Sequence, residues 1–162
     1  MRGNRQRRGF SLIELLIVIT IIAIIATMAL PRLMKAKMLA NETAALGAIK
    51  TLHSAEWQYN SQFGRFAATL AELGPPASGA DNPAGANLIS SDLAGGEKQG
   101  YRFTVTGTPQ GYTMTAAPTT TSNGSRTFYS DQGMDIHENY GQEAATASSP
   151  LVGRTAKASD SK

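Results

Sequence analysis

The sequence predicts an α+β fold in which one long N-terminal helix packs on a small antiparallel β-sheet. Three observations lead to this prediction. Residues 10–30 form a strongly apolar run, residues 32–62 repeat apolar side chains at helical spacing, and short segments after residue 100 alternate apolar and polar side chains. We therefore expect the first half of the helix to span a membrane and its amphipathic second half to pack on the sheet.

Composition excludes several classes of protein. The 162 residues include 15 Lys and Arg, 12 Asp and Glu, and no cysteine. Without cysteine the chain cannot build a disulfide scaffold, a cysteine-ligated zinc site or a thiol nucleophile. Its two histidines, His53 and His137, lie far apart in the sequence, which argues against a histidine-rich metal site. The net charge of +3 is unevenly distributed, because residues 1–9 carry four arginines and no acid.

The apolar run from Phe10 to Leu30 is long enough to cross a bilayer. Of its 21 residues 17 are apolar, and Glu14 is the one charged residue among them. A helix of about 20 apolar residues spans the hydrocarbon core, and the preceding arginines predict a cytoplasmic N-terminus. Placing an ionised carboxylate at bilayer depth costs about 2.5–3.5 kcal/mol of free energy. We therefore expect Glu14 to have a binding partner or a specific function.

Residues 7–32 resemble the N-terminus of type IV pilins and of the related pseudopilins of type II secretion. The resemblance lies in the basic leader, the segment GFSLIELL at residues 9–16, the Ile-rich run after it, and Pro31. It implies that a prepilin peptidase cuts between Gly9 and Phe10 on the cytoplasmic side, and that the new amine of Phe10 is N-methylated. The apolar helix then stays on the mature chain, whereas an ordinary signal peptide loses its apolar run.

The resemblance also implies that Glu14 and Pro31 serve assembly. Glu14 becomes the fifth residue of the mature chain, one helical turn from the Phe10 amine, and is expected to meet the amine of a neighbouring subunit. Such a pair offsets a desolvation cost of several kcal/mol per ion, so it fixes register more than it adds stability. Pro31 removes one backbone hydrogen bond, but helix-forming residues follow it, which predicts a kinked, continuous helix. Whether this region loses helicity in a filament, as it can in pilins, stays open.

Beyond Pro31 the apolar positions define one face of the helix, which is expected to pack against the protein's own sheet. These positions are Met38, Ala45, Ile49, Leu52, Tyr59 and Phe63, with Glu56 in phase. A helix from Phe10 to about Ser61 would be about 78 Å long. So long a helix cannot be buried in one small domain, and its first half needs a membrane or a filament core. The aromatic residues near its end, Trp57, Tyr59, Phe63 and Phe66, are expected to be core, with partner contact as the alternative.

The remaining chain is expected to form a head at residues 63–138. Gly64 should cap the helix, one turn should follow at Thr69–Leu73, and residues 74–99 should be a loop with a short helical turn near Leu88–Leu93. Strands are predicted at 101–106, 112–116, 126–130 and 134–137, as a three- or four-stranded antiparallel meander. The order of long helix, loop and small sheet again resembles pilins. Residues 139–162 are rich in Ala, Ser and Thr and are predicted to be a flexible tail.

The sequence shows no constellation for catalysis, for a cofactor or for a metal. His53 lacks a nucleophile pattern, a phosphate-binding glycine loop is missing, and basic residues outside the leader do not cluster into a nucleic-acid site. Some pseudopilins bind calcium near the C-terminus, and Asp131, Asp135 and Glu138 lie close in sequence. Three acids do not supply the six or more oxygens of a calcium loop, so solvated turn residues are expected. Asn123-Gly124-Ser125 matches a glycosylation triplet, a weak signal.

Together these features predict a structural protein rather than an enzyme. It would be an inner-membrane precursor with its N-terminus in the cytoplasm, processed by a prepilin peptidase and methyltransferase. Inner-membrane pilus assembly machinery would then add it to copies of itself in an extracellular type IV pilus filament on a bacterial surface. One alternative is a pseudopilin of a type II secretion system. Another is a secreted or membrane-anchored binding domain with an ordinary signal, for which Thr27-Met28-Ala29 offers a cleavage site.

The predicted organisation follows from these assignments. Residues 1–9 are the basic leader, 10–31 the hydrophobic assembly helix and 32–62 the amphipathic helix. The head with its loop and sheet takes residues 63–138, and the tail takes 139–162.

Overall fold

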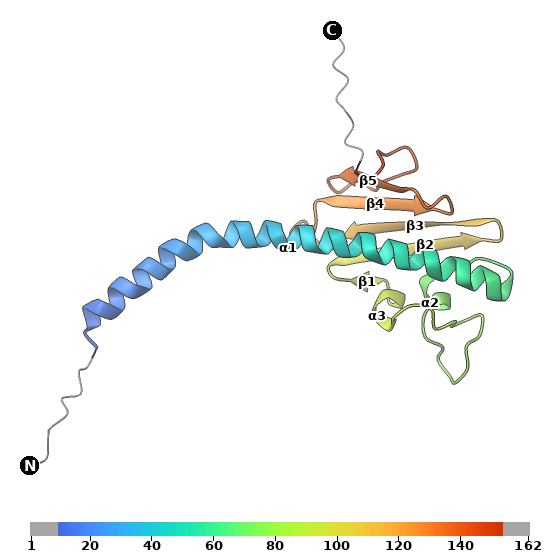
Figure 1. The fold of residues 1–162 in the computed structure, drawn as a ribbon, viewed down its shortest axis with the longest axis horizontal. Helices are drawn as coiled ribbons and strands as arrows, with labels where there is room; N and C mark the ends of the chain where they lie inside the picture. Colours follow the sequence, from blue (N-terminus) through green and yellow to red (C-terminus); the bar gives the residue numbers. More distant parts are fainter. Residues whose placement is uncertain (1–9, 154–162) are drawn as a thin grey trace, which may run out of the picture. The chain divides into compact units, whose positions relative to one another are not determined.

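A computed structural model describes residues 10–153 (Figure 1). The chain divides into two compact units, the first ending at Ala36 and the second beginning at Lys37. The leader, with Gly9, and residues 154–162 lie outside the described part. One helix, α1 (Leu12–Phe63), contributes to both units.

In the first unit, α1 begins directly after Ser11. The carbonyl of Ser11 accepts hydrogen bonds from the backbone N–H groups of Glu14 and Leu15, at 3.1 and 3.2 Å. The apolar residues that follow favour helix sufficiently for α1 to continue through the whole run without interruption. The helix continues through Pro31, as predicted. Proline costs one backbone hydrogen bond there, yet the chain on both sides of it is helical.

The second unit contains the sheet and two short helices. Its five strands are β1 (Glu97–Lys98), β2 (Tyr101–Thr108), β3 (Gly111–Pro118), β4 (Arg126–Asp131) and β5 (Ile136–Tyr140). They lie in chain order, and each pairs antiparallel with the next. The short helices are α2 (Leu70–Leu73) and α3 (Ser91–Ala94). Gly64 ends α1 at a φ of 71°, and its N–H donates to the carbonyl of Asn60 at 2.8 Å, which confirms the predicted cap.

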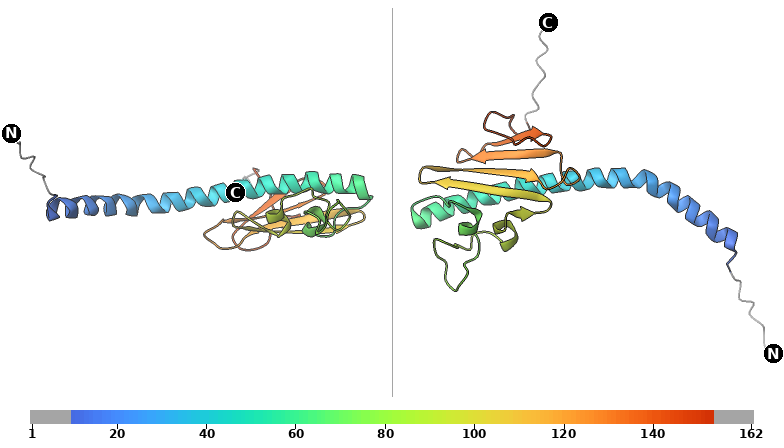
Figure 2. Two further views of the ribbon diagram at one scale, coloured as in Figure 1. Left: turned by 90° about the horizontal axis from the view of Figure 1, so that it is seen from below. Right: turned by 180° about the vertical axis from the view of Figure 1, so that it is seen from behind.

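The core of this unit lies between one face of the sheet and the C-terminal part of α1 (Figure 2). Alternate residues of β2 are buried, as the period-2 pattern predicts for a sheet with one covered face. The buried side chains from the helix include Ala45, Ile49, Leu52 and Tyr59, and those from the sheet include Tyr101, Phe103, Val105, Tyr112, Met114 and Phe128. The predicted apolar stripe is therefore correct at its centre, while Met38 and Phe63 at its ends are half-buried.

The structure corrects the predicted head at the sheet. The sequence predicts three or four strands, but residues 10–153 contain five, because β1 lies inside the segment 74–99 that is predicted to be a loop. A strand of two residues is too short to show a period-2 pattern, and it forms because it pairs with the start of β2. The predicted strands at 101–106, 112–116, 126–130 and 134–137 correspond to β2 to β5 with shifted ends.

The segment after β5 also differs from the predicted tail. Asn139 and Tyr140 are the last residues of β5, and the chain beyond them folds back on the same strand. The N–H of Glu138 donates to the carbonyl of Pro150, and the N–H of Val152 donates to the carbonyl of Ile136, both at 2.8 Å. Backbone hydrogen bonds of this kind need no apolar pattern. Composition alone therefore misassigns residues 141–153.

Candidate functional site

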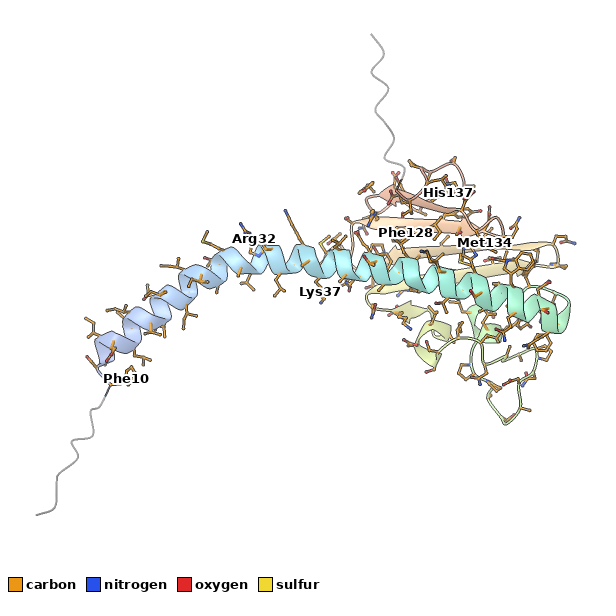
Figure 3. All side chains as sticks on the ribbon, viewed as in Figure 1. Phe10, Arg32, Lys37, Phe128, Met134 and His137 are labelled. Carbon is orange, nitrogen blue, oxygen red and sulfur yellow. The ribbon has the colours of Figure 1, made fainter. Side chains whose placement is uncertain are left out.

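The first unit presents an apolar helix surface that no other described residue covers. Phe10 is 81% exposed, and the large apolar side chains of the helix from Leu12 to Leu33 are exposed around its circumference. Figure 3 shows them projecting from α1 between Phe10 and Arg32. An 18-residue window of this helix has a mean hydropathy of 2.8, and none of it is buried. By length and composition this segment can cross a membrane.

The few polar groups in this segment are mostly satisfied within the helix. The hydroxyl of Thr20 donates to the carbonyl of Leu16, and that of Thr27 to the carbonyl of Ile24, both at 2.7 Å. These internal bonds remove two donors from the helix surface. Glu14 is then the one ionisable side chain between Phe10 and Leu30.

Glu14 lies in the first turn of α1. A carboxylate in this turn interacts favourably with the partial positive charge at the helix N-terminus. Phe10 lies two residues before the first residue of α1, so the backbone nitrogen of Phe10 and the carboxylate of Glu14 belong to the same end of this helix. Pro31 lies at the other end of the apolar run, and Gly9 is outside the described residues. The structure therefore places Phe10 and Glu14 at one end and Pro31 at the other.

In the second unit, a buried ion network ties α1 to the sheet. Arg126 at the start of β4 donates to Glu42 of α1 and to Glu138 of β5, each pair at 2.7 Å. The backbone N–H and the hydroxyl of Ser125 both donate to the second oxygen of Glu42 at 2.8 Å. Burial opposes ionisation of Glu42, but the hydrogen bonds from Ser125 and Arg126 hold its pKa below the usual value. Each charge therefore has partners, as a buried network requires.

Sequence reasoning missed this network. It leaves Glu42 off the apolar face, although Glu42 lies three residues before Ala45 and seven before Ile49, in phase with the buried stripe. An acid at a buried position of a stripe signals a buried partner, but the partner comes from a strand more than 80 residues away. Glu138 is one of the three acids whose closeness in sequence raises the idea of a calcium site. In the structure it forms an ion pair with Arg126.

Among the described residues, no group of three or more His, Asp or Glu side chains could hold a metal ion. The aromatic residues near the end of α1 divide into two environments. Tyr59 and Phe66 are buried, while Trp57 is 46% exposed and packs edge-on against Phe66.

Comparison with known proteins supports the resemblance seen in the sequence. Residues 4–30 match the family model described as the prokaryotic N-terminal methylation motif. Over 73 residues the chain is 36% identical to the type IV major pilin protein PilA of Myxococcus xanthus (strain DK1622). That match covers 45% of this chain and 33% of the relative, so the chain matches about a third of the relative's length. Both similarities support the type IV pilin and pseudopilin family, and the long helix on an antiparallel sheet is a pilin-like arrangement.

Proposed function

We propose that this chain is a structural, non-enzymatic subunit of an extracellular type IV pilus. The observation that carries the proposal is an N-terminal methylation motif, matched at residues 4–30, that overlaps an apolar helix segment with no buried residue. Burial of one Leu, Ile or Phe side chain contributes about 1.5–3 kcal/mol. Helices with this many exposed apolar side chains are unstable in water, and they gain free energy in a bilayer or against each other.

Processing at Gly9 and Phe10 connects these two environments. Before cleavage, the arginine-rich leader holds the N-terminus on the cytoplasmic side of the inner membrane. A prepilin peptidase and methyltransferase then removes the leader and methylates the Phe10 amine. Loss of four arginines lowers the cost of moving this helix end out of the bilayer. The inner-membrane assembly machinery transfers the subunit to the base of the filament, where its helix packs against those of other copies.

Glu14 supplies the register for this packing. Its carboxylate lies in the first helical turn and pairs with the Phe10 amine of a neighbouring subunit in the filament core. An unpaired charge in an apolar core costs several kcal/mol, so a subunit shifted by one residue is strongly disfavoured. Pro31 leaves the Thr27 carbonyl without its helical partner, and this is the point where the helix can lose helicity when subunits pack.

The pilus is favoured over the type II secretion pseudopilin by the relative, which is a type IV major pilin protein. The two roles predict different phenotypes in a deletion strain. Loss of a pilus subunit removes long surface fibres, whereas loss of a pseudopilin abolishes the release of secreted enzymes and leaves surface fibres in place. Electron microscopy of the deletion strain and its complemented counterpart separates these outcomes.

A Glu14→Ala variant tests the assembly mechanism in the complemented strain. We expect the protein to accumulate in the membrane fraction while surface fibres are lost, because the helix remains apolar but its register pair is gone. Glu97→Ala is the matched control, since Glu97 is an exposed acid of the head whose partner is Arg102, and it should restore fibres. Fibres of normal number and length from Glu14→Ala would refute the assigned role.

A further inference from the structure

The ring of His53 is buried between the C-terminal part of α1 and the sheet. The His53 side chain is 5% exposed. Its Nδ1 lies 2.7 Å from the Tyr112 hydroxyl on β3, and its Nε2 lies 2.9 Å from the Ser130 hydroxyl on β4. The Ser130 hydroxyl lies 2.6 Å from the carbonyl oxygen of Asp135, in the turn that joins β4 to β5. One side chain of α1 thus connects two strands and the β4–β5 turn (residues 132–135).

These distances assign every proton in the chain of hydrogen bonds. A carbonyl oxygen only accepts, so the Ser130 hydroxyl donates its proton to Asp135. The oxygen of Ser130 must then accept from His53, which places a proton on Nε2. In a neutral ring Nδ1 is consequently an acceptor, and it receives the Tyr112 proton. The chain is complete with a neutral histidine in a single tautomer.

A second proton on His53 breaks this arrangement. With both nitrogens protonated, Nδ1 can only donate, so the Tyr112 hydroxyl would have to turn its own proton away. Tyr112 is buried, and no other hydrogen-bond partner of its hydroxyl is found within residues 10–153. Burial raises the pKa of Tyr112 to about 12, so the phenol cannot avoid the conflict by losing its proton. The charged ring therefore leaves the buried O–H of Tyr112 without an acceptor and places an unpaired cation in the core.

A groove beside His53 provides space into which the charged ring can move. It has a volume of about 420 Å³ and is lined by Lys50, His53, Ser54, Trp57, Met134 and Ile136. Met134 belongs to the β4–β5 turn, adopts a φ of 63° and is 53% exposed. The His53 side chain thus touches the buried hydrogen-bond chain on one side and an open groove on the other.

We propose that His53 is a proton-operated latch on the β4–β5 turn. When the ring takes up a proton it leaves Tyr112 and Ser130, rotates into the groove beside Trp57 and frees the turn from α1. Deprotonation reverses the movement: the ring returns to Tyr112 and Ser130, and the turn is again held against α1, with Met134 and Ile136 in the groove wall. The head then has two surfaces on this side, one at neutral pH and one in acid.

The charged groups around His53 set the pH of the change. Burial lowers the pKa of His53, and the carboxylate of Asp131 on β4 opposes this by raising it. On α1, Lys50 lines the same groove and Glu56 lies one turn further along. The turn contributes Asp135, whose carbonyl accepts from Ser130. Because burial has the larger effect, the latch opens below the ordinary histidine value of about 6.5.

Fluorescence of Trp57 is a direct probe, since it is the protein's one tryptophan and lines the groove. The full chain in detergent micelles is titrated from about pH 7.5 to about pH 4.5, on either side of the histidine range. We expect a reversible change in emission with a midpoint below about 6.5, and the ring C–H signals of His53 in an NMR titration should share this midpoint. An emission that stays constant over this range would overturn the latch.

Matched variants assign the transition to one histidine. His53→Gln should abolish it, and His137→Gln should retain it, because His137 lies on β5 and contacts Ser149 instead. Both variants are first shown to unfold cooperatively at about pH 7.5, above the histidine range. Because Glu56 titrates in an overlapping range, the transition must also survive in Glu56→Gln. Loss of the transition in His137→Gln or in Glu56→Gln, or its persistence in His53→Gln, contradicts the proposal.

A Tyr112→Phe variant keeps the proposal testable if His53→Gln does not fold. It removes the hydroxyl that donates to the neutral ring and leaves the open state untouched. Loss of one hydrogen bond destabilises the closed state of Tyr112→Phe. We therefore expect the titration midpoint of this variant to be higher than that of the wild type by about one pH unit. A midpoint that does not move, or that falls, shows that Tyr112 does not hold the latch closed and overturns the proposal.

Discussion

The buried carboxyl group of Glu56 makes the stability of the C-terminal unit depend on pH. Glu56 is fully buried; its Oε2 accepts the N–H of Ala67 at 2.9 Å, while its Oε1 has no hydrogen-bond partner among the described residues. Burial raises the pKa of Glu56 to about 7, and the nearby carboxylate of Glu72 adds to the rise. A raised pKa in the folded state means that ionisation favours unfolding. The stability contribution is complete below about pH 4.5 and is lost as the pH rises through about 7.

The size of this effect follows from the rise from 4.5 to about 7. It corresponds to about 3 kcal/mol of unfolding free energy lost when the carboxyl group is ionised. Glu56→Gln removes the ionisation and keeps the hydrogen bond from Ala67, but its amide N–H₂ then lacks a partner at a cost of about 1 kcal/mol. At about pH 8.5 we therefore expect the variant to be more stable than the wild type by about 2 kcal/mol. Below about pH 4.5 it should be less stable by about 1 kcal/mol.

Urea unfolding of the full chain in detergent micelles, followed by Trp57 fluorescence at several pH values, measures this difference. The matched control is Glu72→Gln. Burial raises the pKa of Glu72, but hydrogen bonds from Arg65, Ala68 and Tyr59 outweigh it and lower the pKa overall. Its stability contribution is therefore present at high pH and lost in acid, so Glu72→Gln should be most destabilising where Glu56→Gln is stabilising. A stability difference for Glu56→Gln that does not change with pH would refute the reasoning.

Further predictions concern the head and use the same unfolding assay. Arg126→Ala leaves the two buried carboxylates that it pairs without a cation and should cost about 3–5 kcal/mol; a loss below about 1 kcal/mol would show that the network is solvated. Gly107→Ala places a Cβ in collision with the carbonyl oxygen of Ala67 and should cost about 1–3 kcal/mol through overpacking. Gly47→Ala is its control, because a Cβ there meets nothing within 4 Å, and it should stabilise the helix by about 0.5–1 kcal/mol. Equal stabilities for the two alanine variants would contradict the close approach of Gly107 to Ala67.

The features that the sequence predicts well are those written in local patterns. The apolar run, the period of the stripe around Ile49 and the alternation at Tyr101, Phe103 and Val105 each specify an element over a few consecutive residues. Even the continuation of the helix past Pro31 follows from the helix propensity of its neighbours. These patterns are sufficient for the α+β architecture.

The features it predicts poorly depend on partners far away in the chain. The sequence places Glu42 outside the predicted apolar stripe, while Glu56 interrupts the stripe. Only the folded chain shows Arg126 beside Glu42 and the Ala67 N–H beside Glu56. The segment after β5 is held by the hydroxyl of Thr127, which donates to the carbonyl of Glu143 at 2.6 Å, and by backbone bonds to β5. Ala, Ser and Thr carry no periodic signal for such contacts.

The apolar helix, on this account, is retained after processing and becomes the assembly surface. Intact mass analysis and N-terminal fragmentation of the mature protein, purified from its cells, test this most directly. We predict a chain that lacks residues 1–9 and begins with N-methylated Phe10. A mature chain that begins at Leu30, or one that keeps its arginine-rich leader, would contradict it.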